Sequence, residues 1–222
     1  MNEPEKEYAS PPCSLQDWQT GEHTSVAADI ASWRDNERKR LLAQRRAMDS
    51  AARLSHDQSI MAHLDQYLLA LIGSGEQPLI AVYWPIRGEP DLRRWYSQAA
   101  GRGWRLALPA VVRRDAALSF RSWCPGDELR PDLLNIPAPA ACDEVEPAVI
   151  ITPFVGYDRG GYRLGNGGGY YDRSLPAMAR MPQLIAVGDH FGALRSIYPQ
   201  PHDIPMNAVV TEQGVEEFAS RT

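Results

Sequence analysis

The sequence has 222 residues, 44% of them hydrophobic, which suits a packed globular domain and argues against disorder as the default state. Its 23 basic and 28 acidic residues give a formal net charge of −5, so the chain lacks the positive excess that drives non-specific binding to nucleic acid or anionic membranes. No apolar run approaches the roughly 18 residues of a membrane span. Three widely spaced cysteines and an acidic, proline-containing N-terminus favour a reducing cytoplasm over export.

The N-terminal part of the sequence predicts a tail followed by two helices. Residues 1–24 are rich in Glu, Pro, Ser and Thr without an apolar period, so we expect a flexible tail there and one domain over residues 25–222. Residues 26–48 contain no Gly or Pro and follow a candidate cap at Ser25, which predicts a long helix. A second helix is predicted over residues 57–72, where apolar residues recur every three or four positions.

Beyond residue 77 short apolar or β-branched runs alternate with helical or turn segments, as in an α/β protein. Several runs are continuously apolar, which is typical of strands in a mostly parallel sheet with helices on both faces. Ligands are expected at the carboxyl ends of such strands. The expected strands lie within residues 78–86, 104–112, 118–123, 148–155 and 184–191, with a helical segment over 91–103 and a connecting loop over 137–147.

One segment, DRGGYRLGNGGGYYD over residues 158–172, holds six of the 17 glycines and directly follows an expected strand. The glycines between Gly165 and Gly169 can turn their N–H groups toward an anion, and a helix starting near Tyr170 would add its positive end. Arg163 offers a fork of donors and Asp172 a hard oxygen ligand. The segment matches neither common phosphate-loop spacing, so a set of tight turns remains the alternative to a phosphate site.

A second carboxylate, Asp203, stands just before the apolar, β-branched stretch NAVV. Alone it would be read as a turn residue. Together with Asp172 it becomes a candidate ligand for Mg²⁺, which commonly takes one or two protein carboxylates and completes its shell with water and phosphate oxygens.

Three arginines of the first helix, Arg34, Arg38 and Arg45, share one side of it within an arc of about 40°. Two interpretations are open. The arginines can form a solvated basic face paired with Asp35 or Glu37. Alternatively, Arg34 and Arg38 can reach a bound phosphate or another acidic ligand.

The strand and turn around residues 78–91 carry Trp84 and Glu89 near the expected ligand edge of the sheet. An aromatic residue there can simply fill the core. The pair also suits a flat heteroaromatic ligand that stacks on a ring and offers N–H donors to a carboxylate. His190 and His202 are candidates for polar roles in a site, but no catalytic base is assigned.

Several of these motifs occur together in an order that resembles the 5-formyltetrahydrofolate cyclo-ligase family, also called methenyltetrahydrofolate synthetase. The resemblance covers about residues 25–212. The glycine segment followed some 30 residues later by HDIP is its most specific part. The matching segments are RxxxR at Arg34 and Arg38, GEPD at residues 88–91, NIPAP at 135–139, YDRGGYRLGNGGGYYDR at 157–173 and PHDIPMNAVVTE at 201–212.

The resemblance implies a three-layer α/β/α sandwich with a mostly parallel sheet, like that of sugar-phosphate isomerases and CoA-transferases. It implies Mg²⁺- and ATP-dependent closure of 5-formyltetrahydrofolate to 5,10-methenyltetrahydrofolate, with ADP and phosphate released. No nucleic-acid or membrane partner is expected, in line with the net charge, and no protein partner is implied. By position, it implies ATP binding by Arg34, Arg38, Arg163, Leu164, Gly165, Asn166, Gly167, Gly168, Gly169, Tyr170 and Tyr171, folate binding by Trp84 and Glu89, and Mg²⁺ binding by Asp172 and Asp203.

The family mechanism requires placement and charge neutralisation more than a protein nucleophile. The formyl oxygen attacks the γ-phosphorus of ATP, and N10 of the folate closes the ring before phosphate leaves. Two alternatives share the fold: a non-catalytic paralogue that binds folate or a nucleotide, and a sugar-phosphate or CoA-ester enzyme. A methenyl absorbance signal that depends on ATP would distinguish an ATP-dependent cyclo-ligase from both of these alternatives.

Overall fold

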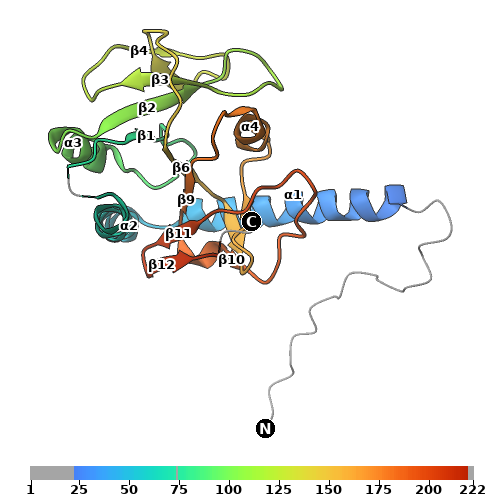
Figure 1. Ribbon diagram of the computed structural model, residues 1–222. Coiled ribbons are helices and arrows are strands. Elements are labelled where there is room, and N and C mark those ends of the chain that lie inside the picture. The colour runs from blue at the N-terminus through green and yellow to red at the C-terminus, as the bar shows by residue number, and fades with distance from the viewer. Residues whose placement is uncertain (1–22, 74, 220–222) are drawn as a thin grey trace.

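The computed structural model describes residues 23–73 and 75–219 of the chain. The expected tail at residues 1–24 lies almost wholly outside the described residues, so the domain boundary stays a prediction. A seven-stranded sheet forms the centre of the described part, in the order β12-β11-β9-β6-β1-β2-β3 (Figure 1). Its strands are β1 (Leu79–Ala81), β2 (Arg105–Ala110), β3 (Ser119–Trp123), β6 (Val149–Pro153), β9 (Gln183–Val187), β11 (Ala208–Thr211) and β12 (Gly214–Glu217).

The sheet is mostly parallel, as expected from the continuously apolar runs. Its five inner strands run parallel to one another, with Ile80 opposite Leu106 and Val149, whereas the edge strands β3 and β12 are antiparallel to β2 and β11. Two small sheets accompany it. One pairs β4 (Leu129–Pro131) with β5 (Pro137–Pro139), a stretch that was expected to be loop, and the other joins β10 (Ala193–Leu194), β7 (Gly156–Asp158) and β8 (Arg163–Leu164).

The two expected N-terminal helices are present as α1 (His23–Ala47) and α2 (Ser50–Leu71). The second begins seven residues earlier than expected, because the Asp49 side chain accepts a hydrogen bond from the Ala52 N–H at 2.9 Å and caps the helix. No helix in the described ranges is long and apolar enough to cross a membrane. The remaining helices are α3 (Arg93–Gly101), the short α4 (Tyr170–Ser174) and the 3-10 turns Leu175–Ala177 and His190–Gly192.

Both faces of the sheet are buried, which explains why its strands are apolar at successive positions. In β1, Ile80 belongs to a core cluster with α2 and α3, and Ala81 to a second cluster on the other face. The second cluster includes Leu175, just after α4, and Phe154. Figure 1 shows α2 and α3 on one side of the sheet and α4 on the other. The expected three-layer α/β/α architecture is confirmed.

The strand order creates a switch point between β1 and β6. From β1 the chain continues outward through β2 to β3, and from β6 it continues in the opposite direction through β9 and β11. The loops that leave the carboxyl ends of β1 and β6 therefore diverge. In open α/β sheets a crevice for ligands forms at such a point.

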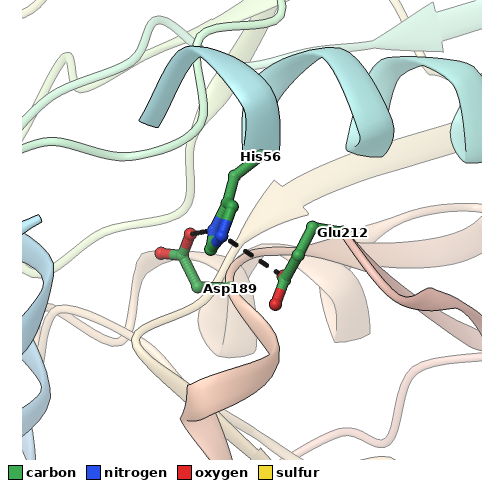
Figure 2. Close-up of side chains that lie close together, drawn as sticks. All are labelled: His56, Asp189 and Glu212. Atoms are coloured by element: carbon green, nitrogen blue, oxygen red, sulfur yellow. Dashed lines mark hydrogen bonds and ion pairs between the residues drawn. The ribbon is translucent and has the colours of Figure 1, made fainter. Parts of the chain in front are cut away.

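A buried network of charges fastens α1 and α2 to the carboxyl ends of the sheet. Arg45, 1% exposed, donates from Nε to Asp189 Oδ2 at 3.0 Å and from Nη2 to the Phe154 carbonyl at 2.8 Å. His56 Nδ1 lies 3.1 Å from Asp189 Oδ1 and 4.0 Å from Glu212 Oε2 (Figure 2). Arg45 is therefore not part of a solvated basic face.

The three side chains of Figure 2 are of types that can ligate metals. Asp189, however, already compensates the buried guanidinium of Arg45, and a divalent cation beside it would place positive charges together where water screens poorly. We therefore interpret the network as a structural one that positions the two helices.

Asp189→Asn should lower the free energy of unfolding by about 3 kcal/mol, because it leaves Arg45 as a buried charge without a counterion. Urea denaturation followed by circular dichroism measures the change. Glu128→Gln, which breaks an exposed pair with Arg130, is the matched control and should cost less than about 1 kcal/mol. Equal losses in the two variants would contradict the structural role of the network.

Candidate active site

A cavity of about 580 Å³ opens at the switch point, where β1, β2 and β6 end. A second cavity of about 600 Å³, lined by residues such as Tyr157 and Arg195, shares none of its residues. Of the residues assigned to ATP, folate and Mg²⁺, all but Leu164 line the first cavity, and Leu164 is buried in β8. Of the two histidines considered for polar roles, His202 also lines this cavity, whereas His190 lines the second one. The lining of the first cavity includes Arg34, Arg38, Trp84, Glu89, Arg163, Gly165, Asn166, Gly167, Gly168, Gly169, Tyr170, Tyr171, Asp172 and Asp203.

The glycine segment forms the basic wall of this cavity. Gly167 and Gly169 have φ angles of 94° and 62°, which L side chains rarely adopt, so glycine is required for the shape of the loop. Arginines hold it from outside, since Arg38 Nε donates to the Gly165 carbonyl at 2.9 Å and Arg173 Nη2 to the Gly168 carbonyl at 2.5 Å. The helix that follows, α4, has only five residues, so the expected helix field is weak.

Arg163 is the most unusual side chain of the cavity. It is 8% exposed, yet it donates no hydrogen bond within the described residues. Its guanidinium lies over the ring of Tyr171 at 5.0 Å, and Nη2 is 3.6 Å from Asp172 Oδ1. Burial raises the pKa of Tyr171 to about 12, although Arg163 opposes the rise, so the phenol keeps its proton at neutral pH. A buried guanidinium with unused donors is suited to an anionic ligand.

The other two arginines divide between the two interpretations given above. Arg34 is buried and forms a two-point ion pair with Asp203, with both N–O distances 3.0 Å, so it contacts neither Asp35 nor Glu37. Arg38 pairs with Asp35 on its own helix and also contacts the glycine segment. Both side chains line the cavity.

Asp172 and Asp203 line the same cavity but are engaged to different extents. Asp172 is largely buried, and Arg163 at 3.6 Å is its ion-pair partner in the described part of the chain. Both oxygens of Asp203 contact Arg34, and Oδ2 also accepts from the Gln200 N–H at 2.7 Å. Each carboxylate keeps free lone pairs on hard oxygen atoms, which is the donor chemistry that Mg²⁺ requires.

The opposite wall of the cavity is aromatic and acidic. Trp84 packs edge-to-face on Trp123 at 6.4 Å, with the Arg93 guanidinium 5.3 Å from its ring. Glu89 is 5% exposed, and burial raises the pKa of its carboxyl group. Its Oε2 accepts from the Ile86 N–H at 2.9 Å. This wall therefore combines a flat apolar surface with a buried hydrogen-bond acceptor.

The turn that carries Glu89 is fixed from below by buried polar groups. Tyr83 donates to the Pro90 carbonyl at 2.7 Å, and Tyr96 donates to the Tyr83 carbonyl at the same distance. Asp57 of α2 accepts from the Asp91 N–H at 3.2 Å. These bonds connect the wall to α3 and to α2.

Sequence reasoning gave no role to the loop between β4 and β5, which also lines the cavity. Asp132 shapes this loop by accepting from the N–H groups of Val111, Leu134 and Ile136 at 2.8 to 3.0 Å. Asn135 has a φ of 60° within it. An Asp followed three residues later by Asn, before Ile-Pro, is the turn signal that could have indicated it. Arg87, at a φ of 51°, was also missed.

Comparison with known proteins gives consistent results. A model of the 5-formyltetrahydrofolate cyclo-ligase family matches residues 30–212. The 5-formyltetrahydrofolate cyclo-ligase of Mycolicibacterium smegmatis is 33% identical over 183 residues, covering 78% of this chain and 91% of that protein. That of Escherichia coli K12 is 33% identical over 146 residues, covering 63% of this chain and 80% of that protein.

Two solved structures have the same fold. The 5,10-methenyltetrahydrofolate synthetase of Aquifex aeolicus, solved by NMR, gives a TM-score of 0.70 at 26% identity and covers 85% of this chain and 95% of that one. A 5,10-methenyltetrahydrofolate synthetase from Mycoplasma pneumoniae gives a TM-score of 0.64 at 23% identity, covering 81% of this chain and 98% of that one, and this likeness concerns the fold alone.

Asp57, beneath the acidic wall, predicts a pH dependence of stability. Burial raises the pKa of its carboxyl group from 3.8 to about 6. The folded chain therefore keeps this proton where the unfolded chain has lost it, so the stabilising effect is present below about pH 4 and is lost as the pH rises through 6. Relative to Asp57→Asn, the wild type should lose roughly 2 to 3 kcal/mol between about pH 4 and pH 7. Urea denaturation across this range tests it, and parallel pH profiles would contradict it.

Proposed function

This chain belongs to the 5-formyltetrahydrofolate cyclo-ligase family, and we propose how its cavity is divided between the two substrates of that family's reaction. The protein is an enzyme that converts 5-formyltetrahydrofolate to 5,10-methenyltetrahydrofolate in an ATP-dependent reaction. The comparisons lend no support to a non-catalytic paralogue. We also propose a cytoplasmic location, which agrees with the exposed free thiols of Cys124 and Cys142.

The basic wall is the proposed site of the ATP triphosphate. The observation that carries this assignment is the buried guanidinium of Arg163, which has no hydrogen-bond acceptor among the described residues and faces a cavity lined by the glycine segment. Phosphate oxygens would supply the missing acceptors in the planar geometry that arginine favours. Backbone N–H groups of the loop, together with Arg34 and Arg38, would share the remaining charge.

Mg²⁺ is proposed to accompany the triphosphate. Asp172 fits it best because, among the described residues, its carboxylate has Arg163 at 3.6 Å as its one ion-pair partner and lines the cavity. Asp203 can contribute a lone pair that neither Arg34 nor the Gln200 N–H uses. When bound, the ion would neutralise phosphate charge. Arg34 keeps Asp203 in place, so this arginine positions a ligand in addition to facing the nucleotide.

The aromatic and acidic wall is the proposed folate site. The pterin is flat and offers N–H donors, which matches the aromatic ring of Trp84 at the cavity and the buried acceptor of Glu89. The two walls belong to a single cavity, so the formyl oxygen can be placed against the γ-phosphate by binding alone. Exclusion of water from this space would protect the phosphorylated intermediate.

Arg163→Gln should raise the KM for ATP about tenfold to a hundredfold, because it removes charge-assisted hydrogen bonds to phosphate, while the KM for the folate changes less than about threefold. The methenyl absorbance of the product, recorded with and without ATP, measures turnover. Arg159→Gln, an exposed arginine of the same segment outside this cavity, is the matched control and should behave as wild type. A larger effect on the folate KM would overturn the assignment of the basic wall.

Asp172→Asn should lower turnover at least about a hundredfold at limiting Mg²⁺, since the amide is a weaker ligand than the carboxylate. Titration of activity with Mg²⁺ measures the shift, and circular dichroism checks that the fold is intact. Asp143→Asn, on an exposed loop, serves as control. A variant with an unchanged Mg²⁺ dependence would remove Asp172 from the metal site.

A further inference from the structure

A hydrogen bond connects the two walls of the cavity. Asn166 Nδ2 donates to Glu89 Oε1 at 2.8 Å, joining the glycine segment to the turn after β1 across 77 residues of sequence. Asn166 is the only residue between Gly165 and Gly169 that has a side chain. Within residues 165–169, the backbone therefore lines the basic wall of the cavity, and the one side chain, the amide of Asn166, contacts the aromatic and acidic wall.

Glu89 depends on this amide more than an exposed glutamate would. Its carboxylate is 5% exposed, so each oxygen needs a donor to replace water. The Ile86 N–H serves Oε2 and Asn166 serves Oε1. Without Asn166, Oε1 would keep no donor among the described residues, and the carboxylate would both cost more to ionise and turn more freely.

We propose that Asn166 is a positioning residue for the folate: its side chain holds Glu89 in the orientation and charge state that receive the pterin N–H groups. This inference rests on the proposed assignment of Glu89 to the folate. It gives the glycine loop two functions, because its backbone serves the nucleotide while its one side chain serves the other substrate. When ATP fixes the conformation of the loop, Asn166 and therefore Glu89 become fixed as well. Binding of one substrate should then raise the affinity for the other.

The competing role for Asn166 is direct contact with the triphosphate, as its place in the glycine segment implies. The two roles differ in which substrate constant responds. An amide that serves phosphate affects the KM for ATP, whereas an amide that serves Glu89 affects the KM for the folate and has no effect once the Glu89 carboxylate is gone.

The test is a double-mutant cycle of Asn166→Ala and Glu89→Gln, with both KM values measured from methenyl absorbance. We expect Asn166→Ala to raise the folate KM about tenfold and to leave the ATP KM within about twofold. In the Glu89→Gln background the same change should have little further effect on the folate KM. Asn166→Gln, which keeps the donor, should recover most of the loss. Asn166→Asp, of the same shape but with like charge beside Glu89, should be worse than alanine.

Binding of the folate measured by calorimetry, with and without a non-hydrolysable ATP analogue, supplies a second readout. The wild type should bind the folate several-fold more tightly with the analogue present, and Asn166→Ala should lose this difference. A raised ATP KM with an unchanged folate KM, or additive effects in the cycle, would overturn the inference. If Glu89→Gln itself left the folate KM unchanged, the assignment of Glu89 would fall as well, so the two failures can be told apart.

Discussion

Buried guanidinium groups at the carboxyl edge of the sheet determine how the rest of the structure is arranged, because each must find negative charge or acceptors away from water. Arg45 pairs with the negative charge of Asp189 and donates to the Phe154 carbonyl, and these two bonds hold α1 against the carboxyl ends of the sheet. Arg34 finds Asp203 at the cavity wall. Arg163 finds no hydrogen-bond acceptor in the described part of the chain. Of the three, Arg163 has the weakest compensation, since its ion-pair partner Asp172 lies 3.6 Å away, and it lines the cavity to which we assign the anionic substrate.

Most of the scaffold could be predicted because it follows from local pattern. Apolar runs such as residues 149–153 pack on both faces and so had to be inner strands, and the absence of Gly and Pro over residues 26–48 predicted α1. The start of α2 was missed because its first turns have no apolar stripe and depend on the cap at Asp49. Strand β5 was missed because a proline-rich segment of three residues acquires its pairing only from β4.

The composition of the site was predictable, but its internal connections were not. Glycines, carboxylates and aromatics at strand ends converge once the sheet is parallel, since carboxyl ends share one edge. Which side chain contacts which depends on how the loops diverge at the switch point. Arg45 and Asp189 are 144 residues apart, and Glu89 and Asn166 are 77 apart, so no local spacing indicates either pair. The arginines of α1 share a helical side, yet one is structural and two face the cavity.

The link between Glu89 and Asn166 also explains why a neutral amide suits this position of the loop. A lysine or arginine there would pair with the buried carboxylate of Glu89 and neutralise the charge that we assign to the pterin N–H groups. An amide satisfies one lone pair of Oε1 and leaves the negative charge and the remaining lone pairs available. In the proposed assignment, the cations for the triphosphate would come from residues other than 165–169, namely Arg163 and Arg38, which contacts the Gly165 carbonyl. In the proposed assignment, residues 165–169 would therefore serve phosphate through their backbone and the pterin N–H donors through Asn166 and Glu89.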